Sequence, residues 1–256
     1  MADWNSTQYL KFENERTQPA IDLARRIPGE APGKILDIGC GPGNSSHVLA
    51  RRFPDASIMG VDSSAAMIET AKANYPTLDF RICDAGKDLS LLGNNFDVIF
   101  SNACIQWIPD HARLLKNLLR LLRPGGILAV QTPMNYKEPI HTIIQEVSTS
   151  DAWRKKFDSP RIFHNLTPEQ YFDLLSEIAS DFCLWETTYY HVLKSHKDIM
   201  EWYRGTGLRP YLNALSDEGA REFERAVFER VVKQYPKQRN GEIIFRFPRF
   251  FFTATA

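Results

Sequence analysis

The segment Ile35–Gly43, with the sequence Ile-Leu-Asp-Ile-Gly-Cys-Gly-Pro-Gly, decides the fold. It joins an apolar run that predicts a buried β-strand to a segment with helical spacing, in which Val48, Leu49 and Phe53 are apolar. Glycines in a turn between a strand and a helix let a ligand approach the backbone closely. The segment therefore predicts the first strand–turn–helix unit of an α/β fold, with a ligand at the turn.

The spacing of these glycines indicates which ligand the turn suits. They follow the pattern Gly-x-Gly-x-Gly, whereas dinucleotide sites use Gly-x-Gly-x-x-Gly, and Asp37 precedes them directly. A carboxylate here would repel the phosphates of a dinucleotide but would attract a cationic amino acid. The pattern favours S-adenosylmethionine over NAD, with a tight turn that binds no ligand as the remaining alternative.

Strand-like and helix-like segments alternate on both sides of this turn. The helical segments include Ser64–Ala73 and Asp110–Leu122, and the latter is stopped by a Pro-Gly-Gly sequence. The apolar runs that predict strands are Lys34–Ile38, Ser57–Val61, Leu78–Cys83, Phe96–Ser101 and Gly126–Gln131. This alternation is typical of a Rossmann-like, doubly wound parallel sheet.

Polar residues stand where these strands end, which is where open α/β sheets bind ligands. Asp62 ends the second strand, where a carboxylate can accept hydrogen bonds from both ribose hydroxyls, although it could instead cap the helix that begins near Ser64. Asp84 follows the third strand and could accept a bond from an adenine amino group, and Asn102 ends the fourth. Together with Asp37 at the first strand, four successive strands end in a polar group that could bind the cofactor, which predicts one cofactor site.

The alternation stops after about residue 132, and helical patterns then dominate. Two further strand-like runs, Phe182–Leu193 and Glu242–Thr253, flank a helical stretch from Ser195 to Tyr235, and we expect them to complete the sheet. We expect one domain over residues 1–256, with a cofactor-binding core at about 30–132, helical cap insertions at about 133–178 and 195–240, and an N-terminal flap at 1–18.

Composition excludes several classes of partner. Lysine plus arginine equals aspartate plus glutamate at 31 each, so no net charge attracts nucleic acid or an anionic membrane. The four cysteines (Cys40, Cys83, Cys104 and Cys183) lack the paired spacing of zinc or redox sites, and no run approaches the roughly 20 apolar residues of a membrane span. We expect a cytoplasmic, metal-free chain with free thiols, acting on a small molecule as a monomer.

The first half resembles the class I S-adenosylmethionine-dependent methyltransferases. The resemblance lies in Leu36–Gly43, Gly60–Asp62, Cys83–Ala85 and Leu122–Gly126, and covers about residues 34–131. It implies a seven-stranded sheet whose last strand is antiparallel, with Gly39 and Asn102 at the methionine part of the cofactor, Asp62 at the ribose, and Asp84 with Ala85 at the adenine. The predicted cofactor-binding residues are Tyr9, Asp37, Gly39, Gly41, Asp62, Ser63, Asp84, Ala85, Asn102 and Gln106.

Further motifs resemble the trans-aconitate 2-methyltransferase family and extend over nearly the whole chain. They include Asp3–Asn5, Ser101–Ala103, Gly205–Pro210 and Phe247–Arg249. The chain departs from the family at Gln18, where the family has a basic residue. This resemblance implies a carboxyl O-methyltransferase that acts on trans-aconitate or a related polycarboxylate.

A polycarboxylate needs fixed cations, and arginine suits it because its planar group binds a carboxylate at two points and stays charged. The candidates are Arg209, in a glycine-flanked turn, and Arg246 or Arg249 near the last strand; each could instead be a solvated surface charge. Possible walls of the pocket are Trp107, Trp202 and Tyr203. His111 could be a general base, but its position at a helix start favours a structural role.

Methylation of a carboxylate requires little acid–base chemistry from the protein. A carboxylate has an unperturbed pKa of about 4, so it needs no general base before it attacks a methyl group. We expect a single displacement that gives a monomethyl ester and S-adenosylhomocysteine, promoted by positioning. The alternatives are methylation of another small molecule or of a carrier-bound acyl carboxylate, and a non-catalytic regulatory protein that binds adenosylmethionine.

Overall fold

The computed structural model describes residues 13–28, 31–87, 89–157 and 163–256, with the backbone alone at 13–16. The chain forms two compact units: unit 1 comprises Met1–Pro133, Phe163–Thr187 and Arg249–Ala256, and unit 2 comprises Met134–Ile162 and Thr188–Pro248. The helix that follows Thr167, which the sequence groups with the first insertion, therefore belongs to unit 1. Most of the predicted N-terminal flap lies outside the described residues.

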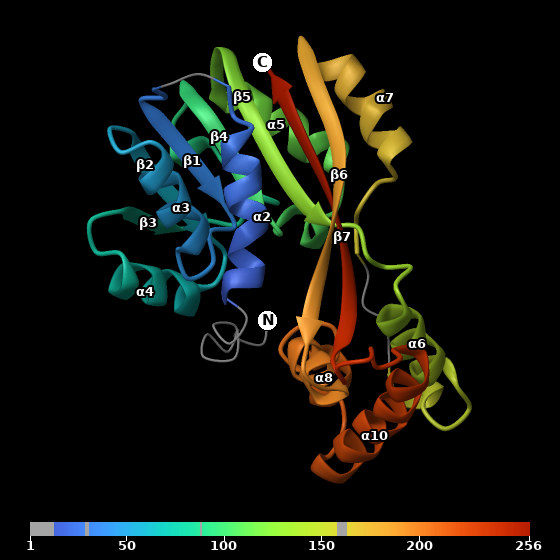
Figure 1. Ribbon diagram of the computed structural model, residues 1–256. Coiled ribbons are helices and arrows are strands. Elements are labelled where there is room, and N and C mark those ends of the chain that lie inside the picture. Colours follow the sequence, from blue (N-terminus) through green and yellow to red (C-terminus); the bar gives the residue numbers. More distant parts are fainter. Residues whose placement is uncertain (1–12, 29–30, 88, 158–162) are drawn as a thin grey trace. The chain divides into compact units, whose positions relative to one another are not determined.

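A seven-stranded sheet runs through unit 1 in the order β3-β2-β1-β4-β5-β7-β6 (Figure 1). Strands β1 to β5 pair in parallel, and β7 pairs antiparallel with β5. This confirms the predicted Rossmann-like sheet with an antiparallel last strand. The strands are β1 (Lys34–Ile38), β2 (Ser57–Asp62), β3 (Asp79–Ile82), β4 (Phe96–Asn102), β5 (Leu122–Pro133), β6 (Asp181–Leu193) and β7 (Ile243–Thr255).

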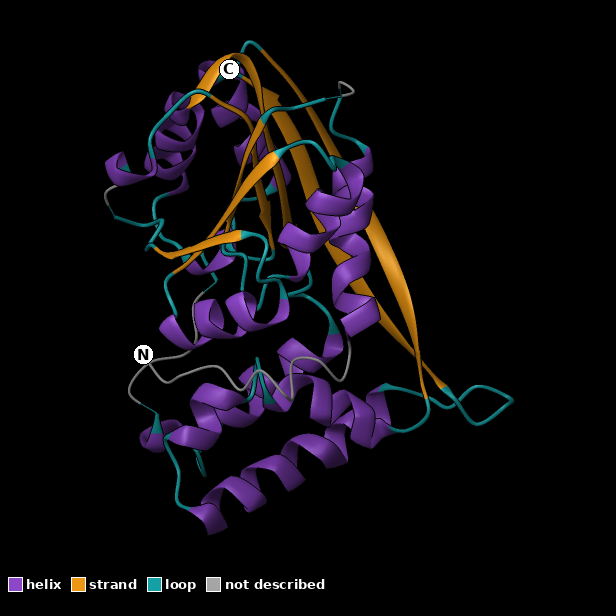
Figure 2. Cartoon of the chain, turned by 90° about the vertical axis from the view of Figure 1, so that its left-hand side faces the viewer, coloured by secondary structure: helices purple, strands orange, loops and turns teal. Residues whose placement is uncertain are grey.

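Helices cover both faces of the sheet in unit 1 (Figures 1 and 2). Because both faces are covered, the central strands are largely apolar, and Ile35, Leu36 and Ile38 are fully buried. The helices of this unit are α2 (Glu13–Arg25), α3 (Asn44–Arg52), α4 (Ala65–Asn74), α5 (His111–Leu121) and α7 (Pro168–Ile178), with short helices η1 (Ser90–Leu92) and η2 (Ile105–Trp107).

Local signals in the sequence fix where these helices begin. The hydroxyl of Ser64 accepts a hydrogen bond from the backbone of Met67 at the start of α4. Asp110 caps α5 in the same way, and Thr167 with Gln170 forms a capping box at the start of α7. These contacts explain why the predicted helix starts agree with the structure.

Strand β5 begins earlier than the predicted Gly126. Leu122 already pairs with Phe96, and the register then shifts, so that Ile127 is the next residue paired, opposite Val98. Gly125 has φ +73° inside this irregular stretch, a conformation that favours glycine. The Pro-Gly-Gly sequence therefore forms a bulge within the strand and does not precede it.

Asp97, on β4, connects the beginning of β1 to β4 and β5 through hydrogen bonds. Its carboxylate accepts hydrogen bonds from the backbone nitrogens of Gly33 and Lys34 at 2.9 and 2.8 Å, and from the guanidinium of Arg123. Desolvation raises its pKa, but the bonds from Arg123 and the two backbone groups outweigh it and lower the pKa overall.

We expect Asp97→Ala to lower the free energy of unfolding by about 2–3 kcal/mol, because three donors lose one charged acceptor. Since the pKa of Asp97 is lowered, its stabilising effect is present above the pKa of the unfolded chain and is lost as the pH falls through the folded value. Urea unfolding at pH 7 and pH 3 measures both effects. An equal loss at the two pH values would contradict this role.

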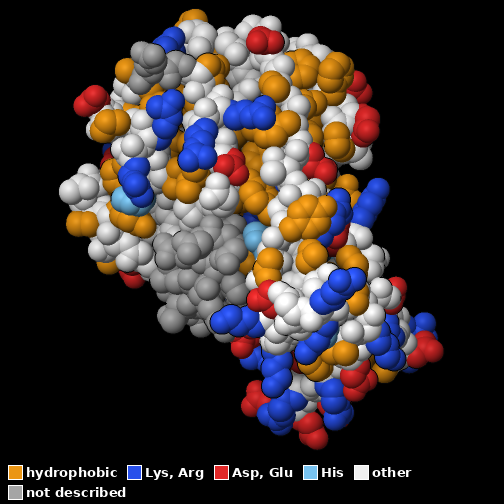
Figure 3. Space-filling view, in the orientation of Figure 1, with side chains coloured by type: hydrophobic (Ala, Val, Ile, Leu, Met, Phe, Trp, Pro, Cys, Tyr) orange, Lys and Arg blue, Asp and Glu red, His pale blue; other side chains and the backbone are white. Residues whose placement is uncertain are grey.

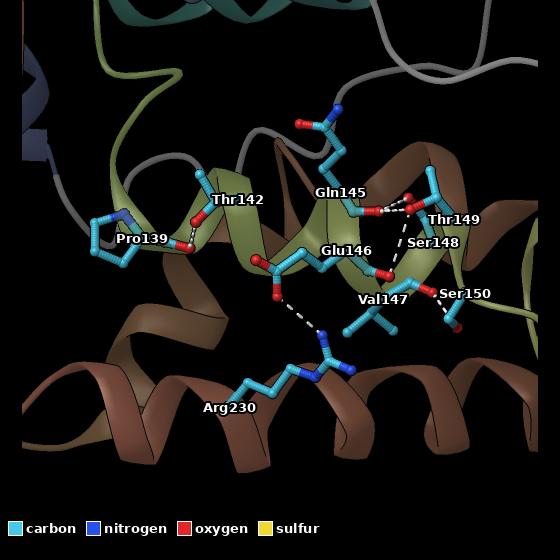
Figure 4. A network of polar contacts seen from close by, with 9 residues as sticks. All are labelled: Pro139, Thr142, Gln145, Glu146, Val147, Ser148, Thr149, Ser150 and Arg230. Carbon is cyan, nitrogen blue, oxygen red and sulfur yellow. Dashed lines mark hydrogen bonds and ion pairs between the residues drawn. The ribbon is translucent and has the colours of Figure 1, made fainter.

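Unit 2 is helical apart from its portions of β6 and β7. Its helices are α6 (Pro139–Thr149), η3 (Arg154–Lys156), α8 (His196–Arg204), α9 (Arg209–Asn213) and α10 (Asp217–Gln234). Helix α10 buries Phe223, Val227 and Val231, one residue per turn, and contacts α6, α8 and α9. An ion pair of 3.1 Å between Arg230 and Glu146 joins α10 to α6 at the surface (Figure 4).

Acidic and basic side chains intermingle over the helical part of unit 2 (Figure 3). Within the described residues, no helix has the length and apolar character needed to cross a membrane. The same residues contain no cluster of histidine, cysteine and carboxylate side chains suited to a metal ion.

Candidate active site

The glycine-rich turn lies between β1 and α3. Gly39, Gly41 and Gly43 all have positive φ, at +71°, +55° and +96°. The backbone nitrogens of Gly39 and Cys40 donate to the carbonyl of Val61 at 2.8 and 3.0 Å, which ties the turn to the end of β2. A Cβ atom on Gly41 would meet no atom of the described residues within 4 Å, so these residues leave space for a ligand at that position.

Asp37 is fully buried just before this turn. Its Oδ2 accepts hydrogen bonds from the hydroxyls of Ser45 and Ser46 at 2.6 and 2.7 Å, while its Oδ1 has no hydrogen-bond partner among the described residues. Burial raises its pKa to about 6, the two serine bonds oppose this shift, and the charge of Asp62 adds to it. One oxygen of a buried carboxylate is therefore left for a ligand.

Asp62 connects the turn to the start of α4. Its Oδ2 accepts from the backbone of Gly41 at 3.0 Å, and its Oδ1 accepts from the backbone of Ser64 at 2.9 Å. Burial raises its pKa against the effect of these bonds. Ser64 is itself the cap of α4, so Asp62 orients the turn and the helix start, and its carboxylate has lone pairs left for ribose hydroxyls.

The adenine candidates follow β3. Asp84 is partly buried, and its Oδ1 accepts from the backbone of Gly86 at 3.0 Å. Lys87 forms an ion pair of 3.3 Å with its other oxygen. Ala85 is partly buried beside it, and Ser63, after β2, is exposed.

The end of β4 holds a second unpartnered acceptor. Oδ1 of Asn102 is buried and has no hydrogen-bond partner among the described residues. The next residue, Ala103, has φ +55°, and its backbone nitrogen donates to the carbonyl of Gln131 at 2.9 Å. Gln106 donates to the carbonyl of Ala103 at 2.6 Å and accepts from Thr132 at 3.2 Å. Gln106 thus holds this strained turn in place, and strain of this kind is common at active sites.

These groups converge at one edge of the sheet. β1 pairs with β2 and β4, so Asp37, Asp62 and Asn102 all stand at neighbouring carboxyl ends. Within the described part of the chain, two buried oxygens lack donors there, beside a glycine turn with space around Gly41. Such a site suits a ligand with a cationic amino group and a bulky body, as S-adenosylmethionine has.

Two features of this site were not predicted from the sequence: the serine contacts to Asp37 and the positive φ of Ala103. Ser45 and Ser46, which hold Asp37, lie in the first turn of α3, and two hydroxyl residues directly after a glycine-rich turn are a signal that could have found them. The strain at Ala103 has no comparable signal, because alanine rarely adopts positive φ.

The aromatic substrate candidates of unit 2 are core residues. Trp202 and Tyr203 are each 3% exposed. The Trp202 ring lies 5.0 Å from the ring of His191, and the Tyr203 hydroxyl is 2.9 Å from Nε2 of His141 and accepts from Asn135 at 3.1 Å. In unit 1, Trp107 is partly buried and packs on Phe163, with ring centroids 5.0 Å apart.

The arginine candidates differ in environment. Arg209 is the partly exposed first residue of α9. Arg246 pairs with Glu138, whose side chain is largely buried, so its charge is already balanced within unit 2. Arg249, in unit 1, is 4% exposed.

Three further residues singled out in the sequence are His111, Gln18 and Tyr9. Both ring nitrogens of His111 are engaged, by the Tyr171 hydroxyl at 2.7 Å and the Ile105 carbonyl at 2.9 Å, and burial lowers its pKa. Gln18 is exposed and donates to Asp22 on the same helix. Tyr9 lies outside the described residues.

Comparisons with known proteins agree with this geometry. A family model described as a methyltransferase domain matches residues 30–204. The trans-aconitate 2-methyltransferase of Rhodopseudomonas palustris strain HaA2 is 43% identical over 256 residues, which cover 99% of each chain. The chain belongs to the trans-aconitate 2-methyltransferase family. This confirms the resemblance drawn from the motifs.

A second member of the trans-aconitate 2-methyltransferase family, from Methylobacterium radiotolerans, is also 43% identical, over 99% of this chain and 98% of its own. Among solved structures, phosphoethanolamine N-methyltransferase 2 of Haemonchus contortus, in complex with phosphomonomethylethanolamine and S-adenosylhomocysteine, superposes with a TM-score of 0.55. It is 18% identical and covers 93% of this chain and 52% of its own. At this identity the likeness concerns the fold alone, and it supports the methyltransferase sheet.

Proposed function

We propose that this protein transfers a methyl group from S-adenosyl-L-methionine to a carboxylate of trans-aconitate, giving a monomethyl ester and S-adenosylhomocysteine. The binding of the cofactor is supported by two buried oxygens, on Asp37 and Asn102, that have no donor among the residues the structure describes and that lie beside the glycine turn. The names of the full-length relatives support the acid substrate.

Different residues of unit 1 would bind different parts of the cofactor. Asp37 and Asn102 would accept hydrogen bonds from its amino group, and Asp62 from its ribose hydroxyls. Asp84 and Ala85 would lie at the adenine, with Gly39 and Gly41 leaving room for the chain between. When bound, the cofactor supplies a methyl group on a positively charged sulfur.

The chain's own contribution to the reaction is positioning. A carboxylate is ionised near neutral pH, so no general base is required. His111 has both ring nitrogens engaged, which supports a structural role for it. Holding two reactants in line can lower a barrier by roughly 7–11 kcal/mol, so orientation alone can supply a large rate enhancement.

A turnover assay with a panel of acids tests the proposal. We expect the purified protein to release S-adenosylhomocysteine with trans-aconitate and to form a product heavier by one methylene unit. The control acids are cis-aconitate, citrate, isocitrate and an acyl-carrier thioester. Methylation of another acid in preference to trans-aconitate, or cofactor binding without turnover, would contradict the proposed substrate.

A further inference from the structure

The amide nitrogen of Gln131, on β5, is a buried donor for which the described residues offer no acceptor. Gln131 is 0% exposed, and its Oε1 accepts a hydrogen bond from Nη1 of Arg249, on the neighbouring β7, at 3.2 Å. A guanidinium only donates, so this contact directs the amide oxygen toward Arg249 and the nitrogen, Nε2, away from it. The orientation of the amide is therefore fixed.

This donor indicates a ligand. Most buried polar atoms in folded proteins have a hydrogen-bond partner, because burial without one costs free energy. An amide nitrogen only donates, so the missing partner is an acceptor such as a carboxylate oxygen. A charged acceptor suits a buried donor best, since hydrogen bonds to an ionised group are roughly twice as strong as neutral ones.

Gln131 lies next to the residues assigned to the cofactor's ammonium group. It is paired in register with Asn102, on β4, and side chains of paired residues lie on the same face of a parallel sheet, about 4.8 Å apart. Asp37 projects from this face as well, because it is paired with Phe100, two residues before Asn102. The adjacent strands β1, β4 and β5 thus present two acceptors and then a donor (Figure 1).

This order of groups matches the two charged ends of an α-amino acid. Its ammonium and carboxylate groups are attached to one carbon atom, so they can reach neighbouring strands of a sheet. Oδ1 of Asp37 and Oδ1 of Asn102 suit the ammonium group, and Nε2 of Gln131 suits the carboxylate. Because an amide is uncharged, Gln131 forms no ion pair with Asp37 that would compete with the ammonium group.

We infer that Nε2 of Gln131 donates a hydrogen bond to the carboxylate of the cofactor's methionine part. The inference rests on the cofactor of the proposed function and does not depend on which acid is methylated. Gln131 is then a cofactor-binding residue on β5. Arg249 acts on the cofactor only through its bond to Oε1, as a positioning residue for the amide.

A carboxylate of the acid substrate has the same chemistry and is the second possible source of the acceptor. The place of Gln131 beside Asn102 favours the cofactor, because an amino acid carries the ammonium group and the carboxylate together. A ligand that lacks only the methionine carboxylate distinguishes the two sources.

The test compares S-adenosylhomocysteine with its decarboxylated analogue by calorimetry. We expect the wild-type protein to bind the analogue about 10- to 100-fold more weakly, because a hydrogen bond to a charged group is lost. Gln131→Met should raise the Kd for S-adenosylhomocysteine by a similar factor and change the Kd for the analogue less than about threefold. Gln131→Glu should weaken S-adenosylhomocysteine further, since its carboxylate repels that of the ligand, and should not weaken the analogue.

Gln145→Met on α6, at an exposed position, is the matched control and should leave both Kd values unchanged. Unaltered binding of the analogue shows that the variants at position 131 fold. Equal weakening of the two ligands by Gln131→Met would indicate a structural role and overturn the inference. So would equal affinity of the wild-type protein for both ligands, a result that requires no variant.

The KM for trans-aconitate completes the test. An unchanged Kd for S-adenosylhomocysteine in Gln131→Met, together with a raised KM, would assign the donor to the substrate and overturn the inference. Calorimetry with the cofactor product requires no acid, so the inference and the proposed reaction can fail separately. If the wild-type protein methylates no acid but discriminates between the two ligands through Gln131, the reaction fails and the carboxylate contact stands.

Discussion

Asp37→Asn should weaken the binding of S-adenosylmethionine and S-adenosylhomocysteine by roughly 30- to 700-fold at pH 7.5. The unpartnered Oδ1 of Asp37 is buried, and an amide there would lose its charge and could present a donor to the ligand's ammonium group. Removing one partner of a buried, hydrogen-bonded charge pair costs about 2–4 kcal/mol, which corresponds to this loss of affinity. Isothermal titration calorimetry measures it directly.

The same side chain makes binding depend on pH. The pKa of Asp37 is raised to about 6 in the folded protein, chiefly by burial, so the free protein holds this proton up to a higher pH than the unfolded chain does. A cationic ligand requires the ionised form, so affinity should be constant above about pH 7 and fall up to about tenfold per pH unit below 6. Asp62, which faces Asp37 and also has a raised pKa, adds to the dependence in the same direction.

Stability should respond in the opposite sense, which provides an internal check. Because the folded pKa is raised, the ligand-free protein loses stability as the pH rises from about 4 to about 6. Asp37→Asn removes this loss, and its amide oxygen can still accept from Ser45 and Ser46, so the variant should melt no lower than the wild type at pH 7.5. Asp55→Asn, at an exposed position, is the matched control. Unchanged affinity in Asp37→Asn would disprove the ammonium contact.

Gly39→Ala should lower the free energy of unfolding by about 2–5 kcal/mol. A Cβ atom at this position would lie 2.2 Å from Sγ and 2.4 Å from Cβ of Cys104, and the backbone has φ +71°. A left-handed conformation costs a residue with a side chain about 1–2 kcal/mol, and overpacking adds about 1–3 kcal/mol. Thermal unfolding of the ligand-free protein, followed by circular dichroism, measures the sum.

Gly41→Ala is the matched comparison, because it shares the positive φ but lacks the steric conflict. In the part of the chain that the structure describes, no atom lies within 4 Å of a Cβ atom at Gly41, so only the backbone cost of about 1–2 kcal/mol remains. The added methyl group would instead occupy space that the cofactor needs, so this variant should fold and bind S-adenosylhomocysteine poorly. Combining Gly39→Ala with Cys104→Gly should recover the steric part of the loss. Equal destabilisation by the two alanine substitutions would refute the assigned contact with Cys104.

The sequence predicted the parallel part of the sheet well because its signals are local. Residues 34–38 and 57–61 are largely apolar runs, and the glycine turn, Asp37 and Asp62 lie within or next to the strands that position them. Capping residues such as Ser64 and Asp110 act over three residues, so the starts of these two helices could be predicted too. The polar residues at the strand ends followed from the parallel topology alone.

The remaining features depend on contacts between distant parts of the chain. Gln131 and Arg249 become neighbours only because β7 pairs antiparallel with β5 in one particular register. The ion pair between Arg246 and Glu138 likewise joins residues far apart in the sequence, and no local pattern predicts which acidic residue an arginine will pair with. The roles of Trp107, Trp202, Tyr203 and Arg209 toward a substrate stay predictions.

The half-satisfied carboxylate of Asp37 also bears on how long the protein persists in a cell. The cofactor would supply the hydrogen-bond donor that the buried Oδ1 of Asp37 lacks among the described residues. Because the cofactor binds the folded chain alone, it stabilises the folded state by mass action, by about 2.7 kcal/mol when its concentration is a hundred times the Kd. When the methyl donor is scarce, more molecules unfold and become accessible to proteases. Metabolic state would in this way set the abundance of the enzyme as well as its rate.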